Sequence, residues 1–157
     1  MKVIILAGGK GSRLSEYTKL IPKPMVKIVK VPIIVRIIKH YEKYGFKEFI
    51  IAAGYKSKII KDYFKNNLLN LDIKIINTGA SSMTGGRIKI LKKYINESFM
   101  LTYGDGLCDV NIKKLLHFHK TNKYIATLTA VRPPARFGGI KIAKNTVKYF
   151  DNYKNLR

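Results

Sequence analysis

The stretch VIILAGGKGSRL, residues 3–14, predicts a buried strand that leaves the core through a glycine-rich and cationic loop. The strand part is apolar and rich in β-branched side chains, as in a short strand that is covered on both faces. Glycine permits close approach of the backbone, so that successive N–H groups can face an oxyanion. The loop is therefore either a turn with solvated charges or a cradle for phosphate. Its spacing matches neither the P-loop pattern nor the G-x-G-x-x-G pattern of dinucleotide sites.

Strand and helix patterns alternate along the rest of the chain. Further strands are expected at 48–54, 71–77, 98–105 and 124–131, and a short hairpin at 138–143 and 146–150. A helix with apolar residues at i, i+3, i+4 and i+7 is expected between Pro32 and Gly45. Two more helices are expected to begin at the capping residues Ser57 and Asn111, and another covers 87–95.

This order of elements predicts an α/β fold, in which helices cover both faces of a mostly parallel sheet. The length of 157 residues fits a single domain over 1–157. Ligands of such sheets bind beyond the carboxyl ends of the strands. Three unusual loops follow strands there, at 8–13, 78–87 and 104–109. Their agreement favours a ligand site more strongly than any one loop does.

Two further motifs carry charged side chains that suit phosphate chemistry. In PKPM, residues 22–25, two prolines fix the backbone on either side of Lys23, which suits an anionic group opposite its ammonium. In TYGDG, residues 102–106, Asp105 follows a strand between two glycines and can bind a hard cation such as Mg²⁺. Asp109 is a nearby second acid. The plainer alternatives, a surface lysine and an aspartate in a turn, stay open at this point.

The basic excess is the unusual feature of the composition. The chain has 31 Lys and Arg against nine Asp and Glu, which gives a net charge of +22. This charge attracts polyanions, but an AT-rich genome also favours lysine, isoleucine, asparagine and tyrosine, so a selected surface and mutational bias both stay open. No segment reaches the about 18 apolar residues of a membrane span, and no signal peptide is evident, so the expected location is cytoplasmic. The lone Cys108 excludes an internal disulfide.

Together these segments resemble the sugar-nucleotidyltransferase family. LAGGKGSRL with PKPM is similar to its N-terminal motif, and YGDG is similar to its metal-binding turn. Longer segments resemble its glucose-1-phosphate cytidylyltransferase branch nearly end to end: GYK at 54–56, TGASSMTGGRIKIL at 78–91, FMLTYGDGLCDVNIKKLLHFHK at 99–120 and ATLTAVRPPARFGGIKI at 126–142.

The resemblance implies a Rossmann-like, three-layer αβα core of the nucleotide-diphospho-sugar transferase type. It implies a reaction in which glucose 1-phosphate, or another sugar 1-phosphate, attacks the α-phosphorus of CTP to give a CDP-sugar and pyrophosphate. Mg²⁺ is the implied cofactor, held by Asp105, and Arg13 and Lys23 are the implied catalytic residues that neutralise phosphate charge. The implied nucleotide-binding residues are Leu6, Ala7, Gly8, Gly9, Gly11, Ser12, Arg13, Lys23, Thr84, Arg87, Tyr103 and Gly104.

The sequence departs from the family pattern in three places. The segment VKVP at 29–32 stands where the family has a GGKP turn, and Tyr153 stands where its EKP motif has lysine. The family also continues beyond position 157, with most of the sugar site and a second metal-binding aspartate. Two interpretations follow: a fragment or a short natural version that binds CTP and Mg²⁺ but is slow or inactive, or a chain whose partner supplies the missing half. A homo-oligomer is expected if an apolar surface is left uncovered.

The sequence supports three classes of function to different degrees. The first is the nucleotidyltransferase, and the second is a catalytically inactive nucleotide-binding or regulatory homologue. A nucleic-acid-binding protein ranks third, because the basic residues form no block longer than a pair and no aromatic platform is evident. His40, His117 and His119 have neither triad nor zinc spacing. No membrane partner is expected.

Overall fold

The computed structural model describes residues 1–11, 18–67, 70–131, 139–143 and 146–151. Contacts divide the chain into two compact units, Met1–Lys114 and Leu115–Arg157. The single domain over 1–157 stays a prediction. Among the described residues, every helix is too short or too polar to span a bilayer.

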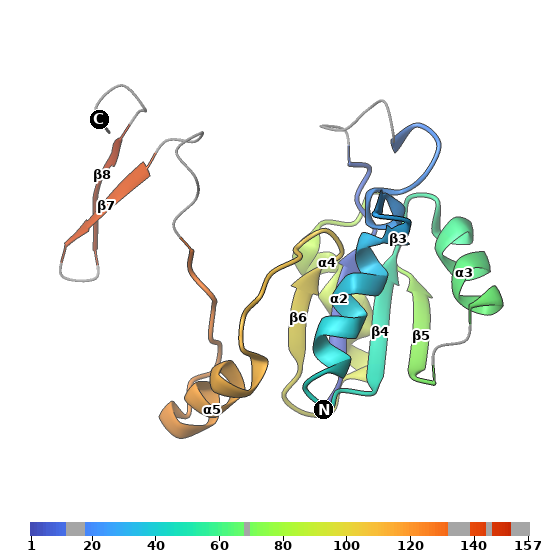
Figure 1. Cartoon of the computed structure of the whole chain (residues 1–157). Coiled ribbons are helices and arrows are strands. Elements are labelled where there is room, and N and C mark those ends of the chain that lie inside the picture. Colours follow the sequence, from blue (N-terminus) through green and yellow to red (C-terminus); the bar gives the residue numbers. More distant parts are fainter. Residues whose placement is uncertain (12–17, 68–69, 132–138, 144–145, 152–157) are drawn as a thin grey trace. The chain divides into compact units, whose positions relative to one another are not determined.

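The first unit is built on a parallel sheet of four strands in the order β5-β4-β1-β6 (Figure 1). The strands are β1 (Val3–Ala7), β4 (Glu48–Ala53), β5 (Asp72–Asn77) and β6 (Met100–Tyr103). In the register, Val3 of β1 lies opposite Phe49 of β4 and Met100 of β6. Every residue of β1 is buried, which explains its unbroken apolar sequence. The mostly parallel sheet predicted from the sequence is confirmed.

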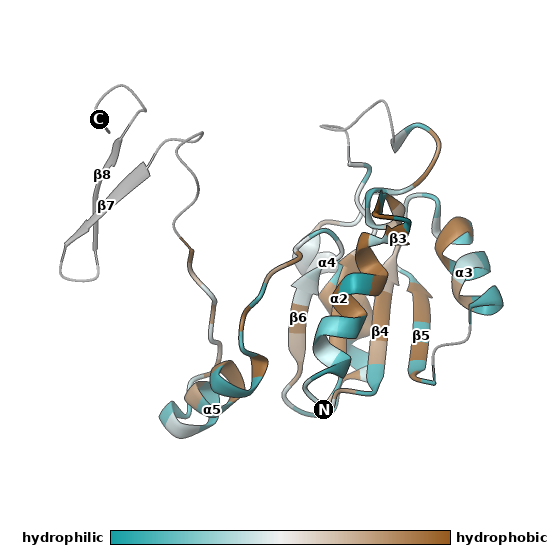
Figure 2. Cartoon of the chain, viewed as in Figure 1, coloured by the Kyte–Doolittle hydropathy of each residue, from teal (hydrophilic) through white to brown (hydrophobic). Residues whose placement is uncertain are grey.

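Helices cover both faces of this sheet. The helices α2 (Ile33–Glu42) and α3 (Ser57–Asn66) pack on the face that holds Val3 and Ile5. The helix α4 (Thr84–Leu91) and the 3-10 turn η3 (Lys92–Tyr94) pack on the face that holds Ile4. In Figure 2 the strands β4 and β5 are largely apolar, while α2 and α3 carry both apolar and polar residues. The first unit therefore has three layers.

The direction in which the chain crosses the sheet reverses after β5. From β1 the chain moves to β4 and β5 on one side, and then returns to β6 on the other side of β1. Right-handed crossovers place connections of opposite direction on opposite faces, which accounts for the separation of α4 from α2 and α3. The strand order switches between β1 and β6, and a crevice for a ligand is expected beyond their carboxyl ends.

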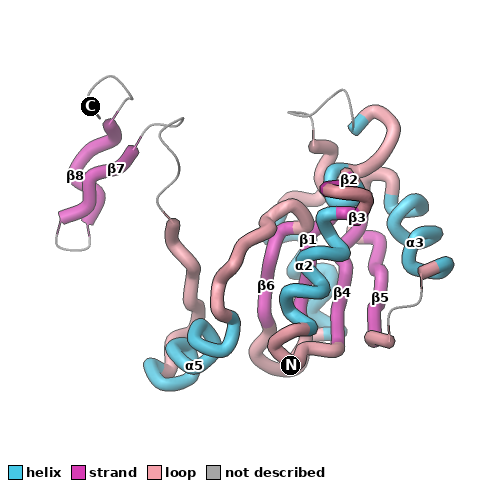
Figure 3. Tube along the Cα trace, in the orientation of Figure 1, coloured by secondary structure: helices cyan, strands magenta, loops and turns pink. Residues whose placement is uncertain are grey.

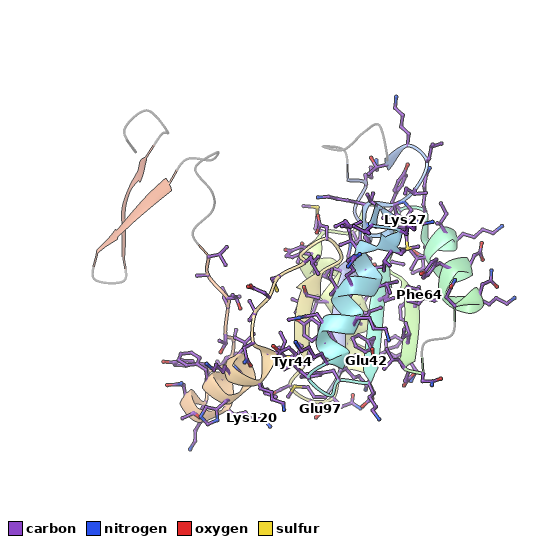
Figure 4. All side chains as sticks on the ribbon, in the orientation of Figure 1. Lys27, Glu42, Tyr44, Phe64, Glu97 and Lys120 are labelled. Atoms are coloured by element: carbon purple, nitrogen blue, oxygen red, sulfur yellow. The ribbon has the colours of Figure 1, made fainter. Side chains whose placement is uncertain are left out.

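At the amino end of the sheet, the first residue makes ionic contacts with two glutamates. The amino group of Met1 lies 3.2 Å from a carboxylate oxygen of Glu97, which Figure 4 labels, and 4.0 Å from one of Glu48.

The helix that begins after Pro32 is confirmed, but the predicted cap at Ser57 is wrong. Ser57 is the first residue of α3, and Lys56 before it holds a left-handed conformation, with φ 50° and ψ 37°. The N–H of Ser57 donates to the carbonyl of Gly54 and that of Ile59 to the carbonyl of Lys56, both at 3.1 Å, so backbone turns satisfy these donors and no side chain caps the helix.

A small hairpin precedes α2. The short 3-10 helix η2 (Lys23–Met25) leads to β2 (Lys27–Ile28) and β3 (Val31–Pro32), which pair antiparallel. The two connecting residues, Val29 and Lys30, have φ of 47° and 68°. Arg36 of α2 donates from Nε and one Nη to the carbonyl of Ile28, at 3.2 and 2.7 Å. These two hydrogen bonds connect the hairpin to α2.

The helix α5 (Ile112–Asn122) begins at the end of the first unit. Its predicted cap is confirmed, because the side-chain oxygen of Asn111 accepts the N–H of Lys114 at 3.0 Å. In the second unit, β7 (Gly139–Ala143) and β8 (Thr146–Asp151) form the predicted antiparallel hairpin. The strand predicted at 124–131 is wrong: this segment is a loop (Figure 3) that pairs with no strand of the described residues. Apolar residues alone do not form a strand without a neighbouring ladder.

Candidate functional site

A cavity of about 280 Å³ lies at the carboxyl ends of β1 and β6, where the strand order switches. Three loops that are far apart in sequence meet there, one each after β1, β5 and β6, together with η2. The lining residues are Leu6, Ala7, Gly8, Gly9, Gly11, Lys23, Pro24, Ser82, Met83, Thr84, Arg87, Tyr103 and Asp105. The structure thus brings together nearly all of the sequence-predicted site residues that it describes.

Arg87 lies at the floor of this cavity and is only 4% exposed. One Nη donates to the hydroxyl of Thr78 at 2.6 Å and to the carbonyl of Gly79 at 2.7 Å. The other Nη donates to the carbonyl of Gly8 at 2.9 Å. Burial lowers the pKa of Arg87, but an arginine so well supplied with acceptors stays charged at neutral pH. A single side chain therefore joins the loops after β1 and β5.

Close packing around this guanidinium explains two glycines. A Cβ on Gly8 would lie 1.9 Å from an Nη of Arg87. A Cβ on Gly54, at the end of β4, would lie 2.4 Å from the carbonyl oxygen of Gly79. Both distances are shorter than real carbon contacts. A side chain at position 54 would meet the backbone of Gly79, and one at position 8 would displace the guanidinium of Arg87. The site residues Gly54 and Thr78 were not assigned from the sequence, although the GYK and TG segments contain them.

Lys23 and Asp105 form an ion pair at the rim of the cavity. Their side chains are 29% and 35% exposed, so the pair is partly in contact with solvent. Pro24 places Lys23 there, because the proline ring packs against Gly104, where an added Cβ would lie 2.8 Å from Cγ of Pro24. Gly104 is buried beneath the cavity and does not line it. The rigid presentation of Lys23 expected from PKPM thus has a structural basis.

Some sequence candidates lie elsewhere. Ser12 and Arg13 are outside the described residues. Asp109 is exposed and does not line the cavity. His40 contacts the carbonyl of Val110 at 2.9 Å through Nε2, and His119 contacts the hydroxyl of Thr127 at 2.9 Å, so both have local structural partners.

A metal ion at this site would have one protein carboxylate to bind. Asp105 offers its oxygens at the rim, and within the described ranges no three His, Cys, Asp or Glu side chains gather as a metal cluster. Mg²⁺ commonly completes its six ligands with phosphate oxygens and water. The residues therefore fit Mg²⁺ that arrives with a phosphate compound, and they do not fit a metal held by the protein alone.

The chain is similar to known proteins over most of its length. Residues 2–152 match the family described as Nucleotidyl transferase. The chain is 43% identical to glucose-1-phosphate cytidylyltransferase of Salmonella typhimurium, over 96% of this chain and 68% of that protein. It is 41% identical to D-glycero-alpha-D-manno-heptose 1-phosphate guanylyltransferase of Campylobacter jejuni, over 73% of this chain and 52% of that protein. The crystal structure of HddC from Yersinia pseudotuberculosis complexed with GMP-PN is similar, with a TM-score of 0.73 and 30% identity, over 96% of this chain and 68% of that one.

Proposed function

Because the chain belongs to the Nucleotidyl transferase family, we propose that it joins CTP to a sugar 1-phosphate, with glucose 1-phosphate as the first candidate. The products are a CDP-sugar, CDP-glucose in that case, and pyrophosphate. The observation that carries the proposal is the cavity at the strand switch, where a glycine loop, two cationic side chains and one carboxylate converge. That combination is suited to a nucleoside triphosphate with its metal ion.

The glycine loop and the end of β6 form the nucleotide subsite. The backbone of Gly8, Gly9 and Gly11 approaches the ligand without side chains in the way, so N–H groups can donate to phosphate oxygens. The nucleoside lies against the remaining walls, which are formed by Leu6, Ala7, Thr84 and Tyr103, with Gly104 beneath them.

The reaction itself needs position and charge more than a covalent partner. A phosphate oxygen of the sugar 1-phosphate bonds to the α-phosphorus of CTP. The bond from that phosphorus to the oxygen bridging the β-phosphorus breaks, and its electron pair leaves with pyrophosphate. Lys23 at the rim and Arg87 at the floor lower the cost of the charge on the reacting phosphates. Arg13 and Ser12 belong to the same proposal from the sequence.

Asp105 is the proposed Mg²⁺ ligand. Its carboxylate is at the rim beside Lys23, where it can exchange an ammonium partner for a metal ion that a triphosphate brings. Bound Mg²⁺ supplies charge neutralisation on the phosphate oxygens. The protein residues orient the phosphates and hold the metal ligand in place.

The choice of base and sugar rests on similarity. The Salmonella relative supports cytosine, whereas the Campylobacter relative is a guanylyltransferase, which makes GTP the main competitor. A supply of activated sugar for polysaccharide synthesis, a cytoplasmic location and self-association are further parts of the proposal, and nucleic acid is not a proposed ligand.

The direct test is pyrophosphate release by the purified chain with glucose 1-phosphate and Mg²⁺, with CTP, GTP, UTP, dTTP and ATP in parallel. Turnover with CTP above the other nucleotides supports the proposal. Calorimetric binding of CTP without turnover supports the second candidate, an inactive nucleotide-binding homologue or a chain that needs a partner, since this chain spans 68% of the Salmonella enzyme. Absence of both binding and turnover rejects the proposal.

A further inference from the structure

The carbonyl oxygen of Gly8 accepts hydrogen bonds from two separate donors. Arg87 donates to it from Nη at 2.9 Å, and the backbone N–H of Tyr55 donates at 3.1 Å. A carbonyl oxygen has two lone pairs, so these two hydrogen bonds saturate it. The peptide plane between Gly8 and Gly9 therefore has one fixed orientation, although its residues have no side chains.

This orientation determines where the N–H of Gly9 points. The described residues contain no cis peptide bond, and in a trans peptide the C=O and the following N–H point in opposite directions. The carbonyl of Gly8 faces Arg87, so the N–H of Gly9 faces away from Arg87. Gly9 lines the same cavity, and an added Cβ there would meet no atom within 4 Å, so its backbone is open to a ligand.

We infer that Arg87 is a positioning residue that aims the N–H of Gly9 at a phosphate oxygen of the bound nucleotide. This inference rests on the proposed nucleotide site and adds the role of one residue in it. Three of the five N–H donors of Arg87 are used on Thr78, Gly79 and Gly8, which belong to two different loops. The planar fork of a guanidinium reaches three acceptors at once, and the single ammonium of a lysine does not. Charge alone therefore cannot replace Arg87.

The test compares wild type with Arg87→Lys, which keeps the positive charge and loses the fork. Binding of CTP with Mg²⁺ is measured by calorimetry, and the amide signal of Gly9 is followed by ¹H–¹⁵N NMR during the same titration. Arg87→Lys is expected to weaken CTP binding roughly tenfold to a hundredfold, the range for one hydrogen bond to a charged group. The Gly9 amide is expected to shift strongly in wild type and weakly in the variant.

Arg36→Lys is the matched control, because Arg36 also donates to a backbone carbonyl, that of Ile28, but does not line the cavity. It is expected to bind CTP as wild type does. Wild-type affinity in Arg87→Lys, or an equal Gly9 shift in both proteins, would overturn the inference while leaving the nucleotide site intact. Failure of wild type to bind CTP would instead reject the proposed function.

A second pair of variants covers the case in which Arg87→Lys does not fold. Thr78→Val removes one acceptor of the fork, and Thr78→Ser keeps the hydroxyl that accepts from Arg87 and donates to the carbonyl of Ala53 at 2.8 Å. The Gly9 shift on CTP binding is expected to decrease in Thr78→Val and to be retained in Thr78→Ser. Identical shifts in the two variants contradict the inference.

Discussion

The ammonium of Lys23 forms an ion pair with the carboxylate of Asp105, 82 positions further along the chain. In the proposed reaction each of these residues has a different partner: Lys23 binds phosphate, and Asp105 binds Mg²⁺. In the nucleotide-free chain the two charges compensate each other at the rim of the cavity. In the proposed reaction a nucleotide and its metal ion replace this pair together: phosphate binds the lysine, and the metal ion binds the carboxylate.

Lys23→Met is expected to raise the affinity of the nucleotide-free chain for Mn²⁺, because the competing ammonium at Asp105 is removed. The increase is about 1.4- to fivefold, since a partly exposed ion pair contributes roughly 0.2–1 kcal/mol. Free Mn²⁺ measured by electron paramagnetic resonance gives this affinity without turnover. Lys27→Met, at an exposed position of β2, is the control. Unchanged Mn²⁺ affinity in Lys23→Met would show that the ammonium of Lys23 does not compete with a metal ion for Asp105.

Asp105→Ala is expected to lower turnover roughly a hundredfold or more, the scale of losing one electrostatic group at a reacting centre. Its thermal stability should change little, because the carboxylate is at the cavity rim and partly exposed. Lys23→Ala should have a similar effect on turnover. Asp109→Ala serves as the comparison, since Asp109 is exposed and outside the cavity. A near-normal rate in either Asp105→Ala or Lys23→Ala removes that residue from the mechanism.

The hairpin turn gives a prediction about stability alone. Val29 and Lys30 hold φ of 47° and 68°, in the left-handed region where the family has glycines. That conformation costs an L-residue roughly 1–2 kcal/mol, against about 0.5–1 kcal/mol for the extra freedom of glycine in the unfolded chain. Val29→Gly is therefore expected to raise the free energy of unfolding in urea by about 0.5–1 kcal/mol. Lys27→Gly, in a strand of the same hairpin, should lower it, and a loss in both variants would contradict the argument.

The sequence predicts those elements that depend on the pattern of neighbouring residues alone. The apolar runs of β1, β4 and β5 and the spacing in α2 are local properties, and the α/β fold and the family resemblance that they support are both confirmed. The segment 124–131 has a strand-like composition but no ladder among the described residues, and a ladder is not a local property.

In the site, too, the sequence does not predict which side chains contact which partners. The sequence predicts that Arg87 and Lys23 are cations near a phosphate loop. It does not predict that Arg87 donates to Gly8, 79 positions away, or that Lys23 pairs with Asp105. These partners depend on which strand ends lie side by side, which follows only from the order of strands in the sheet. The fixed carbonyl of Gly8 is a consequence of that order.

Tyr41 of α2 is expected to make stability depend on pH in alkaline solution. Burial raises its pKa above the ordinary 10.0, with Cys108 adding to the shift and a hydrogen bond with Thr102 reducing it. As the pH rises, the phenol of Tyr41 therefore loses its proton in the unfolded chain before it does so in the folded chain. The stability that neutral Tyr41 contributes is complete below pH 10.0 and is lost as the pH rises through the pKa of the folded chain. Tyr41→Phe should reduce the loss of unfolding free energy between neutral pH and about pH 10.5, which urea unfolding at the two pH values measures. Tyr44→Phe controls for removal of a nearby phenol, and an equal effect of the two variants would refute the assignment.

Gly8 and Gly9 are adjacent in the loop but are expected to respond differently to alanine. In Gly8→Ala the new Cβ would lie 1.9 Å from an Nη of Arg87, so the guanidinium has to move and lose its acceptors. The free energy of unfolding should fall by about 1–3 kcal/mol or more, as for overpacking at a buried position. In Gly9→Ala the Cβ meets no atom within 4 Å, and stability should stay within about 0.5 kcal/mol of wild type. Urea unfolding of both variants measures the difference, and similar losses in the two would mean that backbone freedom, not contact with Arg87, is why this loop has glycine.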